Sequence, residues 1–121
     1  MVVMPESLHT ALTAYATRLR SVFGERLRVV RLFGSYARGE ANEDSDVDVL
    51  VLIDDLTDRE IGLAAGEVAA VIMSTGLPLA PLPMSIERFD ELRRRERELA
   101  REIDVEGISV PLYLTSESPR P

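Results

Sequence analysis

The chain has 121 residues, 45% of them hydrophobic, which is enough to build one core, so we expect a single domain over residues 1–114 followed by a tail over residues 115–121. Its 21 acidic residues outnumber its 14 basic ones and give a net charge of -7, the wrong sign for a protein that binds nucleic-acid phosphates stably. Cysteine and lysine are both absent from the sequence, which excludes disulfides, zinc–thiolate sites, Schiff-base chemistry and a phosphate-loop lysine.

The N-terminal half predicts a helix and two strands. No secretory signal opens the chain and no apolar run is long enough to cross a membrane, so we expect a cytoplasmic protein without membrane contacts. Apolar residues at three- and four-residue steps predict a helix over 7–23, and β-branched and aromatic residues predict a strand over 27–33. Small and polar residues over 34–45 predict a loop with room for a short helical turn. A second strand over 46–53 is apolar on both faces, which predicts a central, covered position. One face comprises Val47, Val49, Val51 and Ile53, and the other comprises Asp46, Asp48, Leu50 and Leu52.

The C-terminal half predicts two helices and two further strands. Thr57 and Glu60 have the spacing of a capping box, which starts a helix predicted over 57–74. The remaining predicted elements are a strand over 77–84, a long helix over 85–104 and a last strand over 108–114. The segment over 77–84 contains three prolines, so as a strand it must lie at an edge of the sheet or be interrupted. Together these elements predict an α/β (α+β) fold, with a mixed sheet of about four strands and helices packed on it.

The segment after the first predicted strand carries the chemistry. Gly34 has no side chain and Ser35 brings a hydroxyl, so their backbone N–H groups can approach and bind phosphate oxygens. Asp46 and Asp48 lie two residues apart on a predicted strand, so both carboxylates project from one face and can hold Mg²⁺ together with phosphate oxygens and water. Arg38 adds a fixed positive charge for the phosphates. A two-metal site of this kind supports phosphoryl chemistry, because one ion activates the attacking hydroxyl and the other neutralises the leaving group.

These residues resemble the signature of the polymerase-beta-like nucleotidyltransferase superfamily, which is Gly-Ser, a gap of about ten residues, and Asp-x-Asp. Here the ten residues from Tyr36 to Ser45 separate Gly34-Ser35 from Asp46-Val47-Asp48. The sequence is most similar to the minimal nucleotidyltransferase (MNT) branch, whose members are often antitoxins paired with a HEPN-domain ribonuclease toxin. The resemblance implies the polymerase-beta-like fold, Mg²⁺ or Mn²⁺ as cofactor, ATP as substrate, and transfer of AMP to a tyrosine of a HEPN toxin. It also implies roles for the site residues: catalysis and metal binding for Asp46 and Asp48, and phosphate binding for Gly34, Ser35 and Arg38.

One feature departs from the superfamily pattern. A third carboxylate normally comes from a later strand, but the segment Leu77–Met84 contains no acid, and Ala80 or a neighbour stands where an aspartate is expected. The nearest acids, Glu87 and Asp90, belong to the helix predicted next. Three readings stay open: nucleotide transfer with two carboxylates, a weak or inactive relative that neutralises its partner by binding, and a stand-alone nucleotide sensor. The charged run over 93–102 predicts a solvated, ion-paired helix face or a docking face for a partner, and the oligomeric state is left open.

Overall fold

A computed structural model of the protein describes residues 4–112, so the predicted tail and the end of the predicted last strand lie outside the described part. In chain order the elements are α1 (Glu6–Phe23), η1 (Gly24–Arg26), β1 (Leu27–Phe33), α2 (Ser35–Arg38), β2 (Val47–Ile53), α3 (Asp58–Gly66), α4 (Val68–Thr75), β3 (Leu79–Met84), α5 (Ile86–Arg95), α6 (Arg97–Glu106) and β4 (Ile108–Ser109). Within the described residues β4 is shorter than the strand predicted over 108–114. Pro111 follows it closely and has no N–H group to continue the ladder.

The four strands form one mixed sheet in the order β3-β2-β1-β4. β1 pairs antiparallel with both β2 and β4, whereas β2 pairs in parallel with β3. The parallel pair needs a crossover connection, which α3 and α4 supply. The predicted mixed sheet of the α+β class is therefore confirmed, and β2 is the inner strand that its two apolar faces predict.

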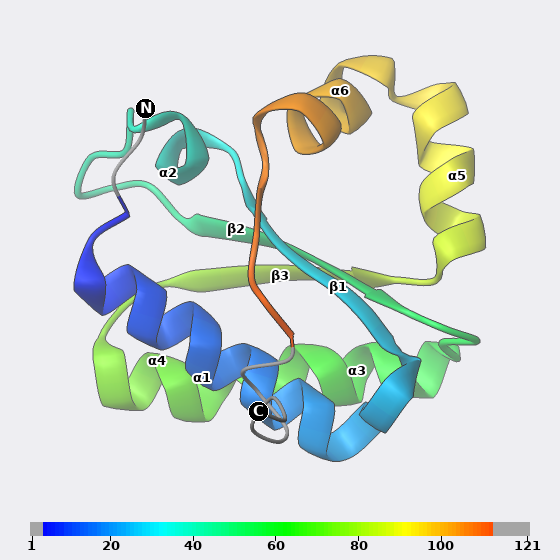
Figure 1. Cartoon of the computed structure of the whole chain (residues 1–121), viewed down its shortest axis with the longest axis horizontal. Helices are drawn as coiled ribbons and strands as arrows, with labels where there is room; N and C mark the ends of the chain where they lie inside the picture. Colours follow the sequence, from blue (N-terminus) through cyan, green and yellow to red (C-terminus); the bar gives the residue numbers. More distant parts are fainter. Residues whose placement is uncertain (1–3, 113–121) are drawn as a thin grey trace, which may run out of the picture.

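Helices cover both faces of this sheet (Figure 1). α1, α3 and α4 share one core with the β2 residues Val47, Val49, Val51 and Ile53. On the opposite face, Phe89 of α5 and Ile103 of α6 share a second core with Leu50 and Leu52. The alternation predicted for the second strand is confirmed, and it sets Asp48 on the face that α5 and α6 cover. No helix within residues 4–112 is long and apolar enough to span a membrane.

Two helices that were predicted to be continuous are divided in the structure. The last predicted helix is interrupted at Glu96, whose φ of -119 and ψ of 68 lie outside the helical region, and α5 and α6 meet there at an angle (Figure 1). On both sides of the bend an apolar residue packs on the sheet, Phe89 from α5 and Ile103 from α6. The helix predicted after the second strand is likewise divided at Glu67, which follows Gly66, a residue that weakens a helix.

β3 is the edge strand that its prolines predict. Val47 N–H donates to Pro78 O at 2.9 Å, which sets the phase of the parallel ladder between β2 and β3. In that phase residues 80, 82 and 84 direct their N–H groups toward β2, and residues 79, 81 and 83 direct theirs outward. Pro81 and Pro83 therefore occupy positions where no ladder bond is lost.

Arg31 of β1 ties the opposite edge of the sheet to α6. Its Nε donates to Ile103 O at 2.9 Å, its Nη2 donates to Asp104 O at 3.2 Å and its Nη1 donates to Ser109 Oγ at 2.5 Å. A basic side chain that binds the last carbonyls of a helix also complements the negative end of the helix dipole. Gly107 is required here because a Cβ atom would collide with Ile103 O and with the Arg31 side chain. The last turn of α6 is thus fixed on the sheet.

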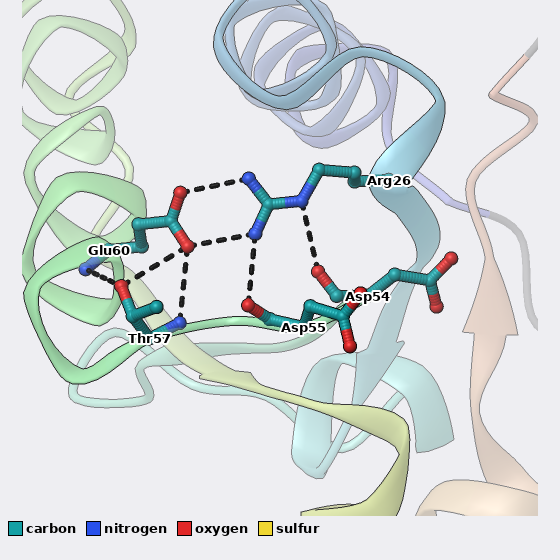
Figure 2. A network of polar contacts seen from close by, with 5 residues as sticks. All are labelled: Arg26, Asp54, Asp55, Thr57 and Glu60. Carbon is teal, nitrogen blue, oxygen red and sulfur yellow. Dashed lines mark hydrogen bonds and ion pairs between the residues drawn. The ribbon is translucent and has the colours of Figure 1, made fainter.

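The turn that follows β2 is held by Arg26 (Figure 2). Its Nε donates to Asp54 O at 3.0 Å and its Nη2 to Asp55 O at 3.1 Å, while Nη1 and Nη2 each donate to the Glu60 carboxylate at 2.8 Å. Glu60 also accepts from Thr57 N–H at 3.1 Å, which completes the predicted capping box of α3. Asp55 has φ 53, a left-handed conformation that aspartate tolerates better than most residues. The network joins η1, the end of β2 and the start of α3.

Glu60→Gln is expected to make the free energy of unfolding less dependent on pH in acid. Hydrogen bonds from Arg26, followed by that from Thr57 N–H, lower the pKa of Glu60 from 4.5 to about 2. A lowered carboxyl pKa favours the folded state above the unfolded pKa, and this contribution is lost as the pH falls from about 4.5 toward about 2. Urea unfolding from about pH 7 to about pH 3 measures this contribution: the difference in free energy of unfolding between wild type and Glu60→Gln should shrink as the pH falls.

Asp58→Asn is the control for this prediction. It changes an exposed acid in the same helical turn and should keep the wild-type pH dependence. An unchanged pH profile in Glu60→Gln would contradict the prediction.

Candidate functional site

Gly34 and Asp48 are in direct contact where β1 ends and β2 begins. Gly34 has φ 77 and ψ -157, a backbone conformation that is essentially restricted to glycine. A Cβ atom at this position would lie 3.2 Å from Asp48 Cγ and closer still to Oδ2. Glycine is therefore needed for the backbone and also for the space that the Asp48 carboxylate fills. The predicted loop glycine and the second predicted aspartate meet in one place.

Asp48 lies between Phe33 on β1 and Ala80 on β3 in the register of the sheet. Side chains of directly paired residues project from the same face, so a carboxylate at position 80 would stand next to Asp48. The prediction that Ala80 occupies the place of the third acid agrees with this register. Across residues 4–112, no group of three or more histidine, aspartate or glutamate side chains is arranged to hold a metal ion. The site offers two carboxylates, from Asp46 and Asp48.

A short hydrogen-bonded turn brings Asp46 to the start of β2. Ser45 N–H donates to Asn42 O at 3.0 Å, and Asn42 N–H donates to Ser45 Oγ at 3.0 Å. Asp44 N–H donates to Asn42 Oδ1 at 2.9 Å. These bonds close the loop immediately before the strand, in the way that Asn and Ser side chains commonly organise turns. Asp46 is the exposed last residue before β2, so the strand begins one residue later than predicted.

The charges around Asp48 disfavour its ionised form. Partial burial raises the pKa of the Asp48 carboxyl, the charges of Asp46 and Glu102 raise that pKa further, and the Arg38 guanidinium lowers it. A divalent cation relieves this kind of unfavourable negative charge. Mg²⁺ typically takes one or two protein carboxylates and completes its shell with water and substrate phosphate oxygens. Two neighbouring carboxylates therefore fit a metal ion that shares its coordination shell with a polyphosphate.

Arg38, the last residue of α2, is paired with carboxylates on both sides. Its Nε donates to Glu40 Oε1 at 2.9 Å, and its Nη1 forms an ion pair with Glu102 of α6. Glu106, one turn further along α6, has its Oε1 3.9 Å from the same nitrogen. The positive charge predicted for the phosphates is therefore held in a bridge between α2 and α6, which lie at the same end of the sheet (Figure 1).

Ser35 and Tyr36 open α2 directly after Gly34. The hydrogen bonds of this turn begin with Ala37 N–H and Arg38 N–H, which donate to Gly34 O at 3.0 Å and 3.2 Å. The first N–H groups of a helix precede the intrahelical bonds and have no carbonyl of their own helix to bind. These N–H groups and the Ser35 hydroxyl follow the glycine that contacts Asp48, so donors for an anion and ligands for a cation are adjacent in the structure.

Glu102 is the residue of this region that sequence reasoning did not single out. It lies in the charged run for which a solvated, ion-paired face was predicted, and part of that run behaves so: Arg93 pairs with Asp90 and Asp104. Glu102 instead turns toward Arg38 and acts on the charge of Asp48. One sequence signal could have identified Glu102: it is adjacent to Ile103, an apolar residue of the helix face that packs on the sheet.

Comparisons with known proteins concern the family of this chain. The family model described as nucleotidyltransferase domain matches residues 15–113. The protein adenylyltransferase MntA of Thermococcus cleftensis is 54% identical over 46 residues, which are 38% of this chain and 44% of that protein. The match therefore spans less than half the length of MntA. A candidate protein adenylyltransferase of Methanocaldococcus jannaschii is 31% identical over 81 residues, which are 67% of this chain and 77% of that protein.

Two solved structures share the fold. A chain from a toxin–antitoxin structure determined with AMP-PNP superposes with a TM-score of 0.54 and 22% identity, over 82% of this chain and 72% of that chain. A chain from the complex of the tri-AMPylated Shewanella oneidensis HEPN toxin with its MNT antitoxin superposes with a TM-score of 0.50 and 19% identity, over 85% and 71% of the two chains. At this level of identity the likeness concerns the fold.

Proposed function

Since the chain belongs to the nucleotidyltransferase domain family and to its polymerase-beta-like MNT branch, we propose that it transfers a nucleoside monophosphate, AMP from ATP, to a partner protein. The observation that carries this proposal is the contact between Gly34 and Asp48 within the spaced motif, with Asp46 close enough to act on the Asp48 charge. It brings phosphate donors and two carboxylates together at one site.

Each site residue then has a defined task. Asp46 and Asp48 hold Mg²⁺, with Mn²⁺ as the alternative ion, and the first N–H groups of α2 with the Ser35 hydroxyl bind the triphosphate. When bound, a pair of such ions supplies activation of the attacking hydroxyl and charge neutralisation at the leaving pyrophosphate. Gly34 keeps the backbone close to Asp48, and Arg38 supplies the positive charge of the cleft. The protein's contribution is largely positioning and electrostatics, as in other phosphoryl transfers.

The acceptor that we propose is a HEPN-domain toxin, which makes this protein the antitoxin of the pair. Two relationships support the choice: the similarity to a protein named as an adenylyltransferase, and the shared fold with an MNT antitoxin bound to a tri-AMPylated toxin. The preference for adenine rests on these relatives alone.

Label transfer tests the proposal directly. The full chain is incubated with Mg²⁺, a HEPN-domain toxin as the candidate acceptor, and ATP labelled either on the α-phosphate or on the γ-phosphate. Transfer of AMP should put the α-label on the HEPN protein and leave the γ-label in solution, and EDTA should abolish the reaction. Absence of α-label on the partner with the metal present would refute enzymatic transfer, and γ-label on the partner would show a kinase instead.

A second function is favoured by Ala80, which leaves Asp48 without the neighbouring acid that the superfamily normally supplies. In this alternative the protein neutralises its partner by contact and its cleft transfers nucleotides weakly or not at all. Neutralisation would then persist in EDTA, because contact between two folded proteins does not require the metal. Neutralisation that requires both ATP and Mg²⁺ excludes this alternative.

A further inference from the structure

The candidate site contains more carboxylates than the two that are proposed to hold metal. Three carboxylates, from Glu40, Glu102 and Glu106, surround the single guanidinium of Arg38, and the two proposed metal ligands lie beside them. Among residues 4–112, Arg38 is the one cation whose charge acts on Asp48. A triphosphate that approaches Arg38 therefore meets a surface with a net negative charge. Phosphate-binding sites usually present several cations instead.

The helix α6, which carries Glu102 and Glu106, is held in place by its contacts with β1 and α5. Ile103, the next residue along α6, is completely buried against the sheet, and its carbonyl accepts from Arg31 at 2.9 Å. Asp104 receives two hydrogen bonds from Arg93 of α5, at 3.0 Å and 3.1 Å. α6 is thus fastened both to β1 and to α5 around the position of Glu102. The Glu102 carboxylate faces Arg38 as a fixed charge on a rigid helix.

Among the three carboxylates around Arg38, Glu102 is placed to have the strongest effect. Its side chain is 31% exposed, compared with 65% for Glu40, so solvent screens its charge less. Glu106 lies on the same helix face one turn away, but its oxygen is 3.9 Å from Arg38 Nη1. Glu102 is also the carboxylate of this group whose charge acts on Asp48.

We propose that Glu102 determines specificity at this site: by neutralising Arg38 and repelling uncompensated phosphate charge, it makes the site select ATP complexed with divalent metal over metal-free ATP. The inference rests on the proposed function and deepens it. Metal-free ATP carries a charge of about -4 and its magnesium complex about -2, so the repulsion by a fixed carboxylate is about twice as large for the free form. When the complex binds, its phosphates would share Arg38 with Glu102, and the metal ions would offset the charge of the carboxylates. Metal-free ATP has no charge with which to offset them.

Glu102→Gln tests this in the full-length protein, with titration calorimetry of ATP in EDTA and of ATP in Mg²⁺. Binding should tighten by about threefold for the magnesium complex and about tenfold for metal-free ATP, because the free-energy change doubles with the ligand charge. The selectivity for the metal complex therefore falls, and the effect should shrink as salt is added. Glu106→Gln, a second variant, should shift selectivity in the same direction by less, because its carboxylate lies further from Arg38.

Glu98→Gln is the matched control, since Glu98 is an exposed acid one turn before Glu102 on α6. It should leave the selectivity at the wild-type value. If Glu102→Gln also leaves selectivity unchanged, or tightens both forms of ATP by the same factor, the role given to Glu102 is wrong while the proposed function stands. If the wild-type protein binds neither form of ATP, the proposed function itself fails and the inference fails with it.

Discussion

Replacing Asp46 and Asp48 together by alanine is expected to lower AMP transfer by about a thousandfold or more, to the background of the assay, because both proposed metal ligands are removed. The free energy of unfolding should stay the same or rise slightly. The reason is that the raised pKa of Asp48 marks a charge that the folded state holds at a cost, and alanine removes that charge. Label transfer and urea unfolding of the same preparation measure both quantities.

Asp44→Ala is the control for the double variant, because Asp44 is an exposed acid of the same loop. Transfer by the control should match wild type, and retained transfer by the double variant would refute the assignment of the two aspartates. Co-expression with the partner adds a second measurement, the neutralisation of the partner's toxicity. Loss of neutralisation by a double variant that still binds the partner would exclude neutralisation by contact alone, whereas full neutralisation would favour it.

Gly34→Ala is expected to have the second largest effect, lowering both stability and transfer. The φ and ψ of Gly34 lie in a region where other residues pay about 1–3 kcal/mol, so the free energy of unfolding should fall by that amount. The new Cβ atom would in addition displace the Asp48 carboxylate. A displacement of about 1 Å in a reacting group can lower a rate about a hundredfold, so transfer should fall on that order.

Gly24→Ala separates these two causes. Gly24 also has a positive φ, 60, but a Cβ atom there would meet nothing within 4 Å. Its substitution should destabilise the fold by a similar amount, through the backbone alone, and leave transfer at the wild-type level in protein that remains folded. Equal transfer by Gly34→Ala and Gly24→Ala would contradict the view that Gly34 seats Asp48.

Much of the fold could be predicted because it depends on local periodicity. The alternation along β2 identifies an inner strand with two apolar faces, and the prolines of β3 identify an edge. The capping box of α3 follows from two residues at a fixed spacing. The break at Glu96 could not be predicted in this way, because neither proline nor glycine stands there. It arises from tertiary packing, which makes two short apolar helix faces meet one sheet.

In the candidate site, too, the features set by local sequence could be predicted, and those set by tertiary packing could not. Four residues of the site, Gly34, Ser35, Asp46 and Asp48, belong to one continuous segment, so their spacing alone predicts a shared site. Glu102 reaches Arg38 only because the chain turns at Glu96 and returns along α6. An unbroken helix, as predicted, would have directed that residue elsewhere. The sequence also predicts that Arg38 serves the phosphates, but its pairing with α6 depends on tertiary structure that no local pattern encodes.

The outer edge of β3 limits how other proteins can associate with this one. Pro81 and Pro83 have no N–H group to offer, and Leu79 N–H is already used in a bond to Leu77 O at 2.9 Å. An incoming peptide that extends a sheet by β-augmentation needs a row of donors of this kind, and β3 has none to give at these three positions. A strand that paired there would find carbonyl acceptors but no N–H donors at these three positions, which disfavours extension of the sheet. This edge therefore favours recognition through side chains, and the same prolines protect it against edge-to-edge aggregation.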